Sequence, residues 1–314
     1  MARVLVTRRL TDGGTDPLVN AGHEIIATAD DAPLTSEELR AGAADCDGIV
    51  CLLTDRIDAE VLQAGHVGRL RVVANAAVGY DNIDVATAHS LGIAVCNTPG
   101  VLDATTADLA FLLILTATRD TTQAEDDLRH GRWSGWGFNT HLARDVNGAT
   151  LGLVGYGRIA RAVAARAAGF DMEVLHHSRT DTGLPGYVAS LPELLARSDI
   201  VSLHVPLTES THHLIGAAEL ALMKPTAVLV NTARGPVVDE DALVDALEAG
   251  TLHAAGLDVF EGEPSVNPRL LTAPRTTLLP HIGSATIETR TRMGRLACQG
   301  VVDVLAGRTP PNLV

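Results

Sequence analysis

The chain has 314 residues and a net charge of −14 at pH 7, with 46% apolar and 20% charged residues. This composition is typical of a folded globular protein, and the length predicts two domains. The acidic balance argues against nucleic acid or an anionic membrane as the main partner, because phosphate groups attract a basic face.

Single residue types exclude several chemistries. Lys224 is the only lysine, so no Gly-Lys pair exists for a phosphate-binding loop of the Walker type.

The longest apolar run, Leu109–Leu115, is far shorter than the roughly 20 residues that span a bilayer. The first ten residues lack the pattern of a cleavable signal. No Cys-x-x-Cys pair occurs, so reduced thiols and a soluble, cytoplasmic protein are expected. The four cysteines are Cys46, Cys51, Cys96 and Cys298.

Short runs of Val, Ile and Leu alternate with helix-like stretches along the whole chain. Near-continuous apolar strands separated by helices predict parallel sheets covered on both faces, in two doubly wound α/β domains. The predicted strands are Val4–Thr7, Glu24–Ala27, Ile49–Leu53, Val72–Ala76, Ile93–Cys96, Thr150–Val154, Glu173–His176, Ile200–His204, Val228–Asn231, Gly256–Val259 and Thr277–Leu279.

Two long helices are predicted as well. One follows the turn at Asn97–Gly100 and extends from about Asp103 to His130, and its apolar middle predicts burial between domains or against another subunit. The other extends from about Ala285 to Ala306 near the end of the chain.

The clearest motif is G-x-G-x-x-A at Gly155, Gly157 and Ala160, between a predicted strand and a predicted helix. In that context the first glycine permits a tight turn and the second lets a pyrophosphate approach the backbone. The small third residue allows close helix–strand packing. The motif therefore predicts dinucleotide binding.

The next strand end bears on the choice of cofactor. An acidic residue there would hold the ribose 2′-hydroxyl of NAD, but the strand ends before Ser178, Arg179 and Thr180. Because a guanidinium can pair with a 2′-phosphate, these residues favour NADPH. Asp181 lies slightly further on and leaves NAD as an alternative.

Reactive side chains follow three later strands, where ligands of open α/β sheets bind. They include Arg234, Asp258, Glu263 and His281. An arginine can anchor a carboxylate, an imidazole can exchange a proton, and a nearby carboxylate favours the protonated imidazole. Position alone leaves His281 as one candidate among twelve histidines.

Other chemistries fit the sequence poorly. His212 and His213 are adjacent and are expected to point in different directions, and no H-E-x-x-H motif occurs, so no metal site is predicted. No G-x-S-x-G nucleophile elbow occurs either.

Taken in order, these motifs resemble those of the D-isomer-specific 2-hydroxyacid dehydrogenases over nearly the whole chain, and particularly the glyoxylate/hydroxypyruvate reductase branch. The third glycine is Ala160, and Gly137-Phe138 follows Trp136 where the family has a variable residue and Pro. The matching segments are Cys51–Asp58, Val78–Asp84, Asn97–Leu102, Thr106–Ala110, Trp133–Trp136, Thr150–Ala160, His204–Thr208, Asn231–Gly235, Asp258–Phe260, Glu263–Pro264 and Pro280–Thr286.

The resemblance implies a role for each candidate residue. Arg234 would bind the substrate carboxylate and carbonyl, His281 would be the acid/base, and Glu263 would support it. Backbone N–H groups of Val78 and Gly79 would bind the carboxylate.

Leu53 would limit substrate size, and Asp258 would contact the nicotinamide carboxamide. The residues implied in cofactor binding are Thr106, Gly155, Tyr156, Gly157, Arg158, Ile159, Ser178, Arg179, Thr180, His204, Val205, Pro206, Thr211, Thr232, Ala233, Asp258, His281 and Gly283.

The resemblance also implies a domain plan. A Rossmann cofactor domain, residues 99–284, would be inserted into a flavodoxin-like substrate domain made of residues 1–98 and 285–314. Family members are usually homodimers paired through the cofactor domain, and the apolar helix is consistent with such pairing.

The implied reaction is NADPH-dependent reduction of a small 2-oxo acid, glyoxylate or hydroxypyruvate, with the proton supplied by His281. Two alternatives stay open. One is the same chemistry on another acid, such as phosphoglycerate, a larger 2-oxo acid or a phosphonate. The other is a dinucleotide-sensing, corepressor-like binding protein.

Overall fold

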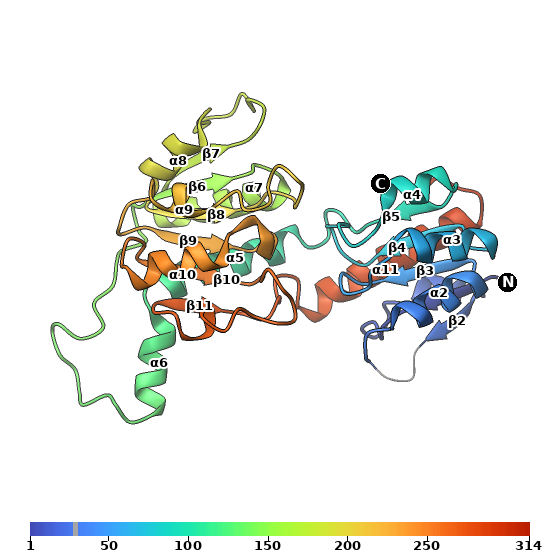
Figure 1. Ribbon diagram of the computed structural model, residues 1–314, viewed down its shortest axis with the longest axis horizontal. Coiled ribbons are helices and arrows are strands. Elements are labelled where there is room, and N and C mark those ends of the chain that lie inside the picture. Colours follow the sequence, from blue (N-terminus) through green and yellow to red (C-terminus); the bar gives the residue numbers. More distant parts are fainter. Residues whose placement is uncertain (28–30) are drawn as a thin grey trace. The chain divides into compact units, whose positions relative to one another are not determined.

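The computed structural model describes residues 1–27 and 31–314. The chain divides into two compact units, one made of Met1–Leu102 and Ser284–Val314 and the other of Asp103–Gly283 (Figure 1). This division lies close to the expected one: it falls after Leu102 instead of residue 98, and before Ser284 instead of residue 285. The turn that precedes the division is held within the first unit, because the Asn97 and Thr98 N–H groups donate to the carbonyls of Asn312 and Ala77 at 3.1 and 2.8 Å.

The first unit contains a five-stranded, fully parallel sheet in the order β2-β1-β3-β4-β5. This is the strand order of flavodoxin-like folds, as predicted. Its strands are β1 (Arg3–Val6), β2 (Glu24–Ala27), β3 (Gly48–Cys51), β4 (Val72–Asn75) and β5 (Ala94–Cys96). Its helices are α1 (Asp16–Asn20), α2 (Ser36–Asp45), α3 (Ala59–Val67), α4 (Val85–Ser90) and α11 (Ile287–Leu305).

Helices cover both faces of this sheet, which explains why its strands are mostly apolar. Alternate residues of a strand point to opposite faces, so Val4 and Val6 pack in one cluster with Val301 of α11, while Leu5 packs in another with Leu39 of α2. The helix near the end of the chain therefore completes the core that the N-terminal strands begin.

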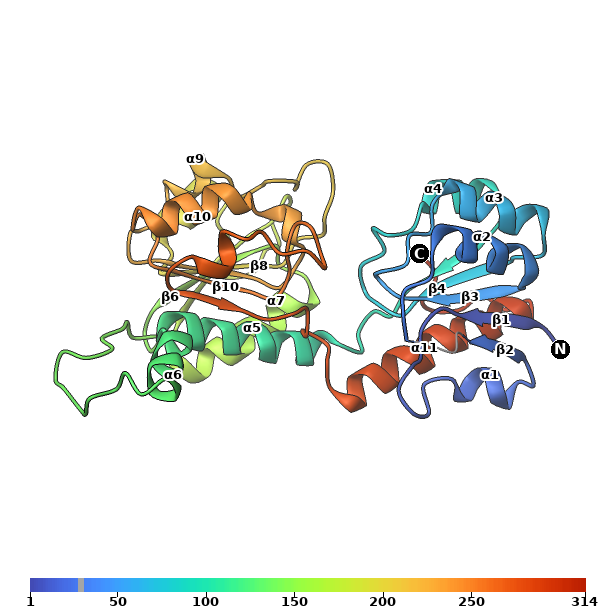
Figure 2. The same cartoon turned by 60° about the horizontal axis from the view of Figure 1, so that its bottom comes forward.

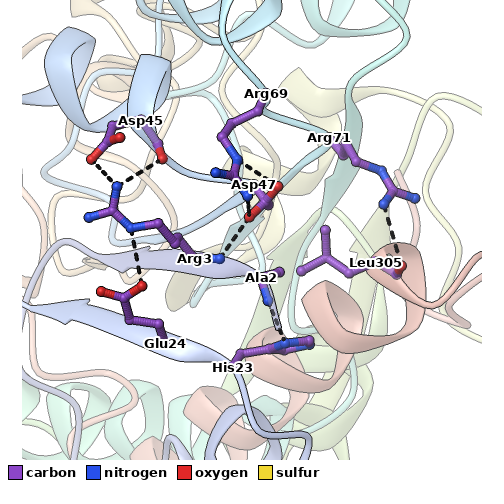
Figure 3. A network of polar contacts seen from close by, with 9 residues as sticks. All are labelled: Ala2, Arg3, His23, Glu24, Asp45, Asp47, Arg69, Arg71 and Leu305. Atoms are coloured by element: carbon purple, nitrogen blue, oxygen red, sulfur yellow. Dashed lines mark hydrogen bonds and ion pairs between the residues drawn. The ribbon is translucent and has the colours of Figure 1, made fainter.

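A polar network ties the amino ends of these strands together (Figure 3). The Arg3 N–H donates to Asp47 at 2.7 Å, and its guanidinium pairs with Glu24 and Asp45. Arg69 makes two hydrogen bonds to Asp47, at 2.9 and 2.7 Å. The side chain of Asp47 is only 14% exposed, so this carboxylate joins the start of β1 to the segment between α3 and β4.

The second unit contains a six-stranded parallel sheet in the order β11-β10-β9-β8-β6-β7. The order reverses direction between β6 and β8, and such a switch point is where dinucleotides bind in doubly wound folds. Its strands are β6 (Thr150–Val154), β7 (Glu173–His177), β8 (Ile200–Leu203), β9 (Val228–Asn231), β10 (Ala254–Leu257) and β11 (Thr276–Leu278).

Helices cover both faces of this sheet (Figure 2). Helices α5 and α7 share a core with one face, and α8 and α10 share a core with the other. The helices are α5 (Asp103–Thr118), α6 (Thr121–Arg129), α7 (Arg158–Ala167), α8 (Leu191–Arg197), α9 (Ala217–Leu220) and α10 (Glu240–Glu248), with short 3₁₀ turns at Ala168–Phe170, Gly235–Val237 and Leu270–Thr272.

The long helix predicted after the boundary is in fact two helices. Asp120 has φ 47° in the left-handed region, which ends the α5 geometry and starts α6 in a new direction. Within this single chain Leu112 of α5 is 45% exposed, so burial of the helix on all sides would need a second chain. Hydrophobic periodicity did not detect this break because the apolar pattern ends before it. None of the helices in residues 1–27 and 31–314 is long and apolar enough to cross a membrane.

We predict that Asp47→Asn destabilises the protein by about 1–3 kcal/mol at pH 7, because the Arg69 guanidinium and the Arg3 backbone N–H lose an ionised acceptor. Burial alone would raise the pKa of Asp47, but the Arg69 hydrogen bonds and the Arg3 N–H hold it below its usual value. A lowered pKa stabilises the folded state above the unfolded pKa. The difference from wild type should therefore shrink as pH falls through the folded pKa.

Urea unfolding at several pH values measures this effect. Asp12→Asn is the control, since Asp12 is fully exposed and lies 3.9 Å from Arg9. Equal stability of Asp47→Asn and wild type at pH 7 would contradict the role assigned to the network.

Candidate active site

The turn that carries Arg234 is built at the carboxyl end of β9. The Asn231 side chain accepts a hydrogen bond from the Ala233 N–H at 3.0 Å and donates one to the Arg234 carbonyl at 2.8 Å. The next residue, Gly235, lies against the backbone of Phe260, where a Cβ would be 1.9 Å from the Phe260 carbonyl carbon. This close approach brings the arginine turn next to the loop that contains Glu263.

Glu263 and His281 form a hydrogen-bonded pair. His281 Nδ1 lies 2.7 Å from Glu263 Oε2, and Glu263 Oε1 accepts the Phe260 N–H at 2.9 Å. Burial alone would raise the pKa of Glu263, but the hydrogen bond from His281, together with the charges of His281 and Arg234, holds it below its usual value. Glu263 is therefore an anion at neutral pH and favours a protonated imidazole beside it.

The backbone of His281 is held in an unusual conformation. Its φ is 54°, in the left-handed region that few residues other than glycine adopt. The buried Asp258 carboxylate fixes this loop by accepting the N–H groups of Ile282 and Gly283, each at 2.7 Å. The carboxylate at the end of β10 thus determines where the imidazole after β11 points.

Thr106 and Gly283 lie beside the same carboxylate. A Cβ on Gly283 would be 3.1 Å from Asp258 Oδ2 and 3.5 Å from Thr106 Cγ2, so these three predicted cofactor residues form one cluster. Burial raises the pKa of Asp258 to about 6, against the opposing effect of the two N–H donors. Asp258 therefore titrates much closer to neutrality than an exposed aspartate.

The glycine turn after β6 has two glycines with different physical reasons. Gly155 has φ 86°, and a Cβ there would be 2.7 Å from the His204 carbonyl oxygen. The fold therefore requires glycine at this position even without a ligand. A Cβ on Gly157 would meet nothing within 4 Å, and no side chain caps the helix α7 that begins next to it. Open space beside uncapped N–H groups fits an approaching pyrophosphate.

In the loop after β7, where contacts to the cofactor were expected, some side chains make hydrogen bonds within the loop itself. Ser178 Oγ donates to the Thr180 carbonyl at 2.7 Å, so its proton is used within the loop, although its oxygen can still accept. Arg179 is exposed. Asp181, the residue that left NAD as an alternative, accepts the Gly183 N–H at 2.8 Å through one carboxylate oxygen in a local turn.

Three further predicted cofactor positions have clear local roles. Burial lowers the pKa of His204 to about 4, so this imidazole is neutral at pH 7. The Tyr156 ring stacks on His176 at 3.7 Å between centroids. The Thr211 hydroxyl donates to the Pro206 carbonyl at 2.6 Å and closes the loop after β8.

Thr232 provides a test of whether a cofactor fits this strand edge. Its hydroxyl oxygen is buried and has no hydrogen-bond partner among the described residues. A buried polar atom without a partner is costly in a folded protein, so a ligand group is a reasonable partner for it. Together with the open space at Gly157, this observation fits a dinucleotide at the predicted position.

The predicted substrate residues of the first unit lie after β3 and β4. The carbonyls of Val78 and Gly79 accept hydrogen bonds from Asn97 and Asn75 at 2.8 and 2.7 Å, and no described residue accepts their N–H groups. Leu53 follows Leu52, whose carbonyl accepts a hydrogen bond from Asn82 at 3.0 Å. These contacts orient the Val78 and Gly79 carbonyls and leave their N–H groups available to an anion.

Sequence reasoning missed the amide side chains that organise these turns. Asn75 and Asn231 each end an apolar strand and are almost fully buried, and Asn82 and Asn97 are only partly exposed. A buried polar residue at the end of an apolar run is a visible signal, because it requires hydrogen-bond partners in the adjacent turn.

The expectation for His212 and His213 was wrong. Their rings lie 4.1 Å apart between centroids, because His213 has φ 49° and the left-handed turn brings neighbouring side chains to one side. His213 Nε2 also lies 2.8 Å from Glu261 Oε1.

Comparison with known proteins identifies the family of this chain. The protein-family model described as D-isomer specific 2-hydroxyacid dehydrogenase, NAD binding domain, matches residues 111–283. The chain belongs to the D-isomer-specific 2-hydroxyacid dehydrogenase family. The resemblance seen in the sequence is thus confirmed, as are an NAD-binding domain and an oxidoreductase of the NAD(P)-dependent type.

Individual members of the family cover nearly the whole chain. A glyoxylate reductase from Korarchaeum cryptofilum is 46% identical over 99% of this chain and 95% of its own. A structure of a Thermus thermophilus protein has TM-score 0.92 at 43% identity and covers 99% of both chains. An NADPH-dependent glyoxylate/hydroxypyruvate reductase from Sinorhizobium meliloti has TM-score 0.87 at 35% identity, covering 100% of this chain and 98% of that one.

We predict that Gly235→Ala lowers the melting temperature of this dehydrogenase by about 4 °C or more, because a Cβ would collide with the Phe260 backbone and displace the loop that holds Glu263. Gly157→Ala is the matched control, since its Cβ enters open space, and it should leave the melting temperature within about 2 °C of wild type. Equal melting temperatures for all three proteins would show that the two turns are not in the close contact described.

Proposed function

We propose that this dehydrogenase uses NADPH to reduce glyoxylate or hydroxypyruvate to the corresponding 2-hydroxy acid. The observation that carries the proposal is the pairing of Glu263 and His281 at 2.7 Å, with the charge of Arg234 acting on the same carboxylate. A cation for the substrate carboxylate and an acid for its carbonyl oxygen are the groups that this reduction needs. The glyoxylate reductases among its relatives support the choice of a small 2-oxo acid.

His281 acts as the proton donor in this proposal. The Nδ1 atom of His281 is hydrogen-bonded to Glu263, so Nε2 is the nitrogen that would deliver a proton to the substrate oxygen. Anionic Glu263 fixes the orientation of the ring and stabilises positive charge on it, while Arg234 binds the carboxylate and polarises the carbonyl. A nicotinamide held by the second unit would supply the hydride for the carbonyl carbon.

The cofactor is held by the second unit. The N–H groups at the start of α7, beside Gly157, would bind the pyrophosphate, and Thr232 would contribute its unpartnered hydroxyl. Arg179 would pair with the 2′-phosphate, which is why NADPH is proposed over NADH. On the substrate side, the Val78 and Gly79 N–H groups would bind the carboxylate and Leu53 would restrict its side chain.

The protein is also proposed to be a homodimer paired through the cofactor domain. Several large apolar side chains on α5, α6 and the segment that follows are exposed, and such a surface favours contact with a second copy. Light scattering should then give twice the chain mass of 32.8 kDa, and a monomer at micromolar concentration would refute this part. The side chains are Leu112, Leu128, Trp133, Trp136, Phe138 and Leu142.

The main test follows NADPH oxidation with glyoxylate, hydroxypyruvate, pyruvate and phenylpyruvate. The first two substrates should give the highest kcat/KM, and His281→Ala should lower it by roughly a hundredfold or more for the loss of a general acid. Cofactor binding without turnover of any 2-oxo acid would favour a dinucleotide-sensing protein instead. Unchanged activity of His281→Ala would refute the assigned proton donor.

The pH profile tests Glu263. Above its lowered pKa the carboxylate is ionised and favours protonated His281, so reduction should persist to higher pH in wild type than in Glu263→Gln. In the variant the decline of kcat with rising pH should begin at lower pH, with a loss of about tenfold at pH 8. Glu193→Gln, an exposed change on α8, is the control and should keep the wild-type profile.

Cofactor preference tests Arg179. Arg179→Ala should raise the KM for NADPH by about tenfold and leave that for NADH nearly unchanged, because only NADPH carries the 2′-phosphate. Arg197→Ala removes a surface arginine of α8 and is the matched control. Equal effects on both cofactors, or faster oxidation of NADH by wild type, would contradict the proposed preference.

A further inference from the structure

A second group of ligating side chains lies outside the residues assigned to hydride transfer. His212 and His213 lie between β8 and α9, and Glu261 lies in the loop after β10. One ligand atom from each of these residues lies within 4.8 Å of the others. His213 Nε2 is 2.8 Å from Glu261 Oε1, and the two imidazole rings are 4.1 Å apart. Two imidazoles and one carboxylate thus converge on one point of the surface.

The convergence depends on the backbone at His213. Its φ of 49° is in the left-handed region, which is unfavourable for a residue with a Cβ. Hydrogen bonds to other residues hold this turn. The His213 N–H donates to the Pro236 carbonyl at 2.7 Å, and the His212 N–H donates to the Thr208 carbonyl at 3.0 Å. The two rings are therefore brought together before any ligand arrives.

Glu261 is positioned by a buried carboxylate. Its N–H donates to Glu240 Oε1 at 2.7 Å, and Glu240 is only 5% exposed. The side chains of Glu261 and His213 are themselves 38% and 36% exposed, so solvent can reach the point between them. The loops that carry these side chains are held by hydrogen bonds, and the point between the side chains is open to solvent. Such a site is suitable for binding a small ion from solution.

We propose that His212, His213 and Glu261 bind a divalent transition-metal cation of the Zn²⁺ class. Two imidazole nitrogens and one carboxylate oxygen suit Zn²⁺, whereas Mg²⁺ and Ca²⁺ prefer oxygen ligands alone. Ligand atoms about 2.0–2.2 Å from a tetrahedral zinc lie closer together than the present limit of 4.8 Å, so small side-chain rotations suffice.

Binding would change the hydrogen bonding within the group. The metal replaces the hydrogen bond between His213 and Glu261, takes one lone pair from each ring, and leaves its fourth position to water. Because Glu261 is two residues before Glu263 in the chain, the ion would also restrain the loop that carries the proposed partner of His281.

Titration calorimetry on the full chain, treated with a chelator and then freed of it, tests this site with ZnCl₂. One Zn²⁺ per chain is expected for wild type, with a rise in melting temperature when the metal is present. His212→Ala and Glu261→Gln should each weaken binding by more than about tenfold and abolish that rise. Both residues are exposed, so their metal-free melting temperatures should match wild type. MgCl₂ should give no binding.

Two further variants exclude other sources of metal binding. His66→Ala removes an exposed histidine of α3, and His281→Asn removes the imidazole paired with Glu263, so both should bind Zn²⁺ as wild type does. Absence of saturable binding to wild type would overturn the proposal. Wild-type affinity in both His212→Ala and Glu261→Gln would overturn it as well, and so would loss of binding in His281→Asn, since the ion would then sit elsewhere.

Discussion

The buried carboxylate of Asp258 is the group on which the geometry of the candidate active site depends. It accepts two backbone N–H groups from the loop after β11, and these bonds hold His281 in a left-handed conformation. That conformation presents Nδ1 to Glu263, whose other oxygen is held by the Phe260 N–H. Three consecutive strand ends are thereby joined, because the backbone of Phe260 also packs on Gly235 beside Arg234. Fixed groups of this kind need little reorganisation during a proton transfer.

Charge is arranged locally in a chain that is acidic overall. The net charge of −14 does not favour an anionic substrate or cofactor at long range. Arg234 and the uncapped start of α7 provide favourable charge and dipoles where anions are proposed to bind, and many of the other arginines pair with carboxylates elsewhere. The network around Asp47 is of that second kind and stabilises the opposite, amino ends of the first sheet (Figure 3).

Much of this protein could be predicted from its sequence, for identifiable reasons. Most of the strands are buried on both faces and largely apolar, and the eleven predicted strands were located with bounds that differ by a few residues at most. The glycine turn could be predicted because a larger residue than Gly155 would collide with the backbone of His204. The break at Asp120 was missed, since a left-handed residue within polar sequence changes the direction of a helix without changing the apolar pattern. The convergence of His212 and His213 was missed for the same reason.

The sequence by itself determined the doubly wound architecture, the family and the candidate reactive side chains, because these follow from local patterns and from motifs in a fixed order. Only the tertiary structure decided the contacts and distances at which these groups meet. Arg234, Glu263 and His281 follow three different strands, and parallel strands bring their carboxyl ends to one edge however far apart they are in the chain. The same holds for Glu261, which reaches His213 across 48 residues of chain. Such contacts depend on the register and backbone conformation of separate loops, which no local pattern of residues records.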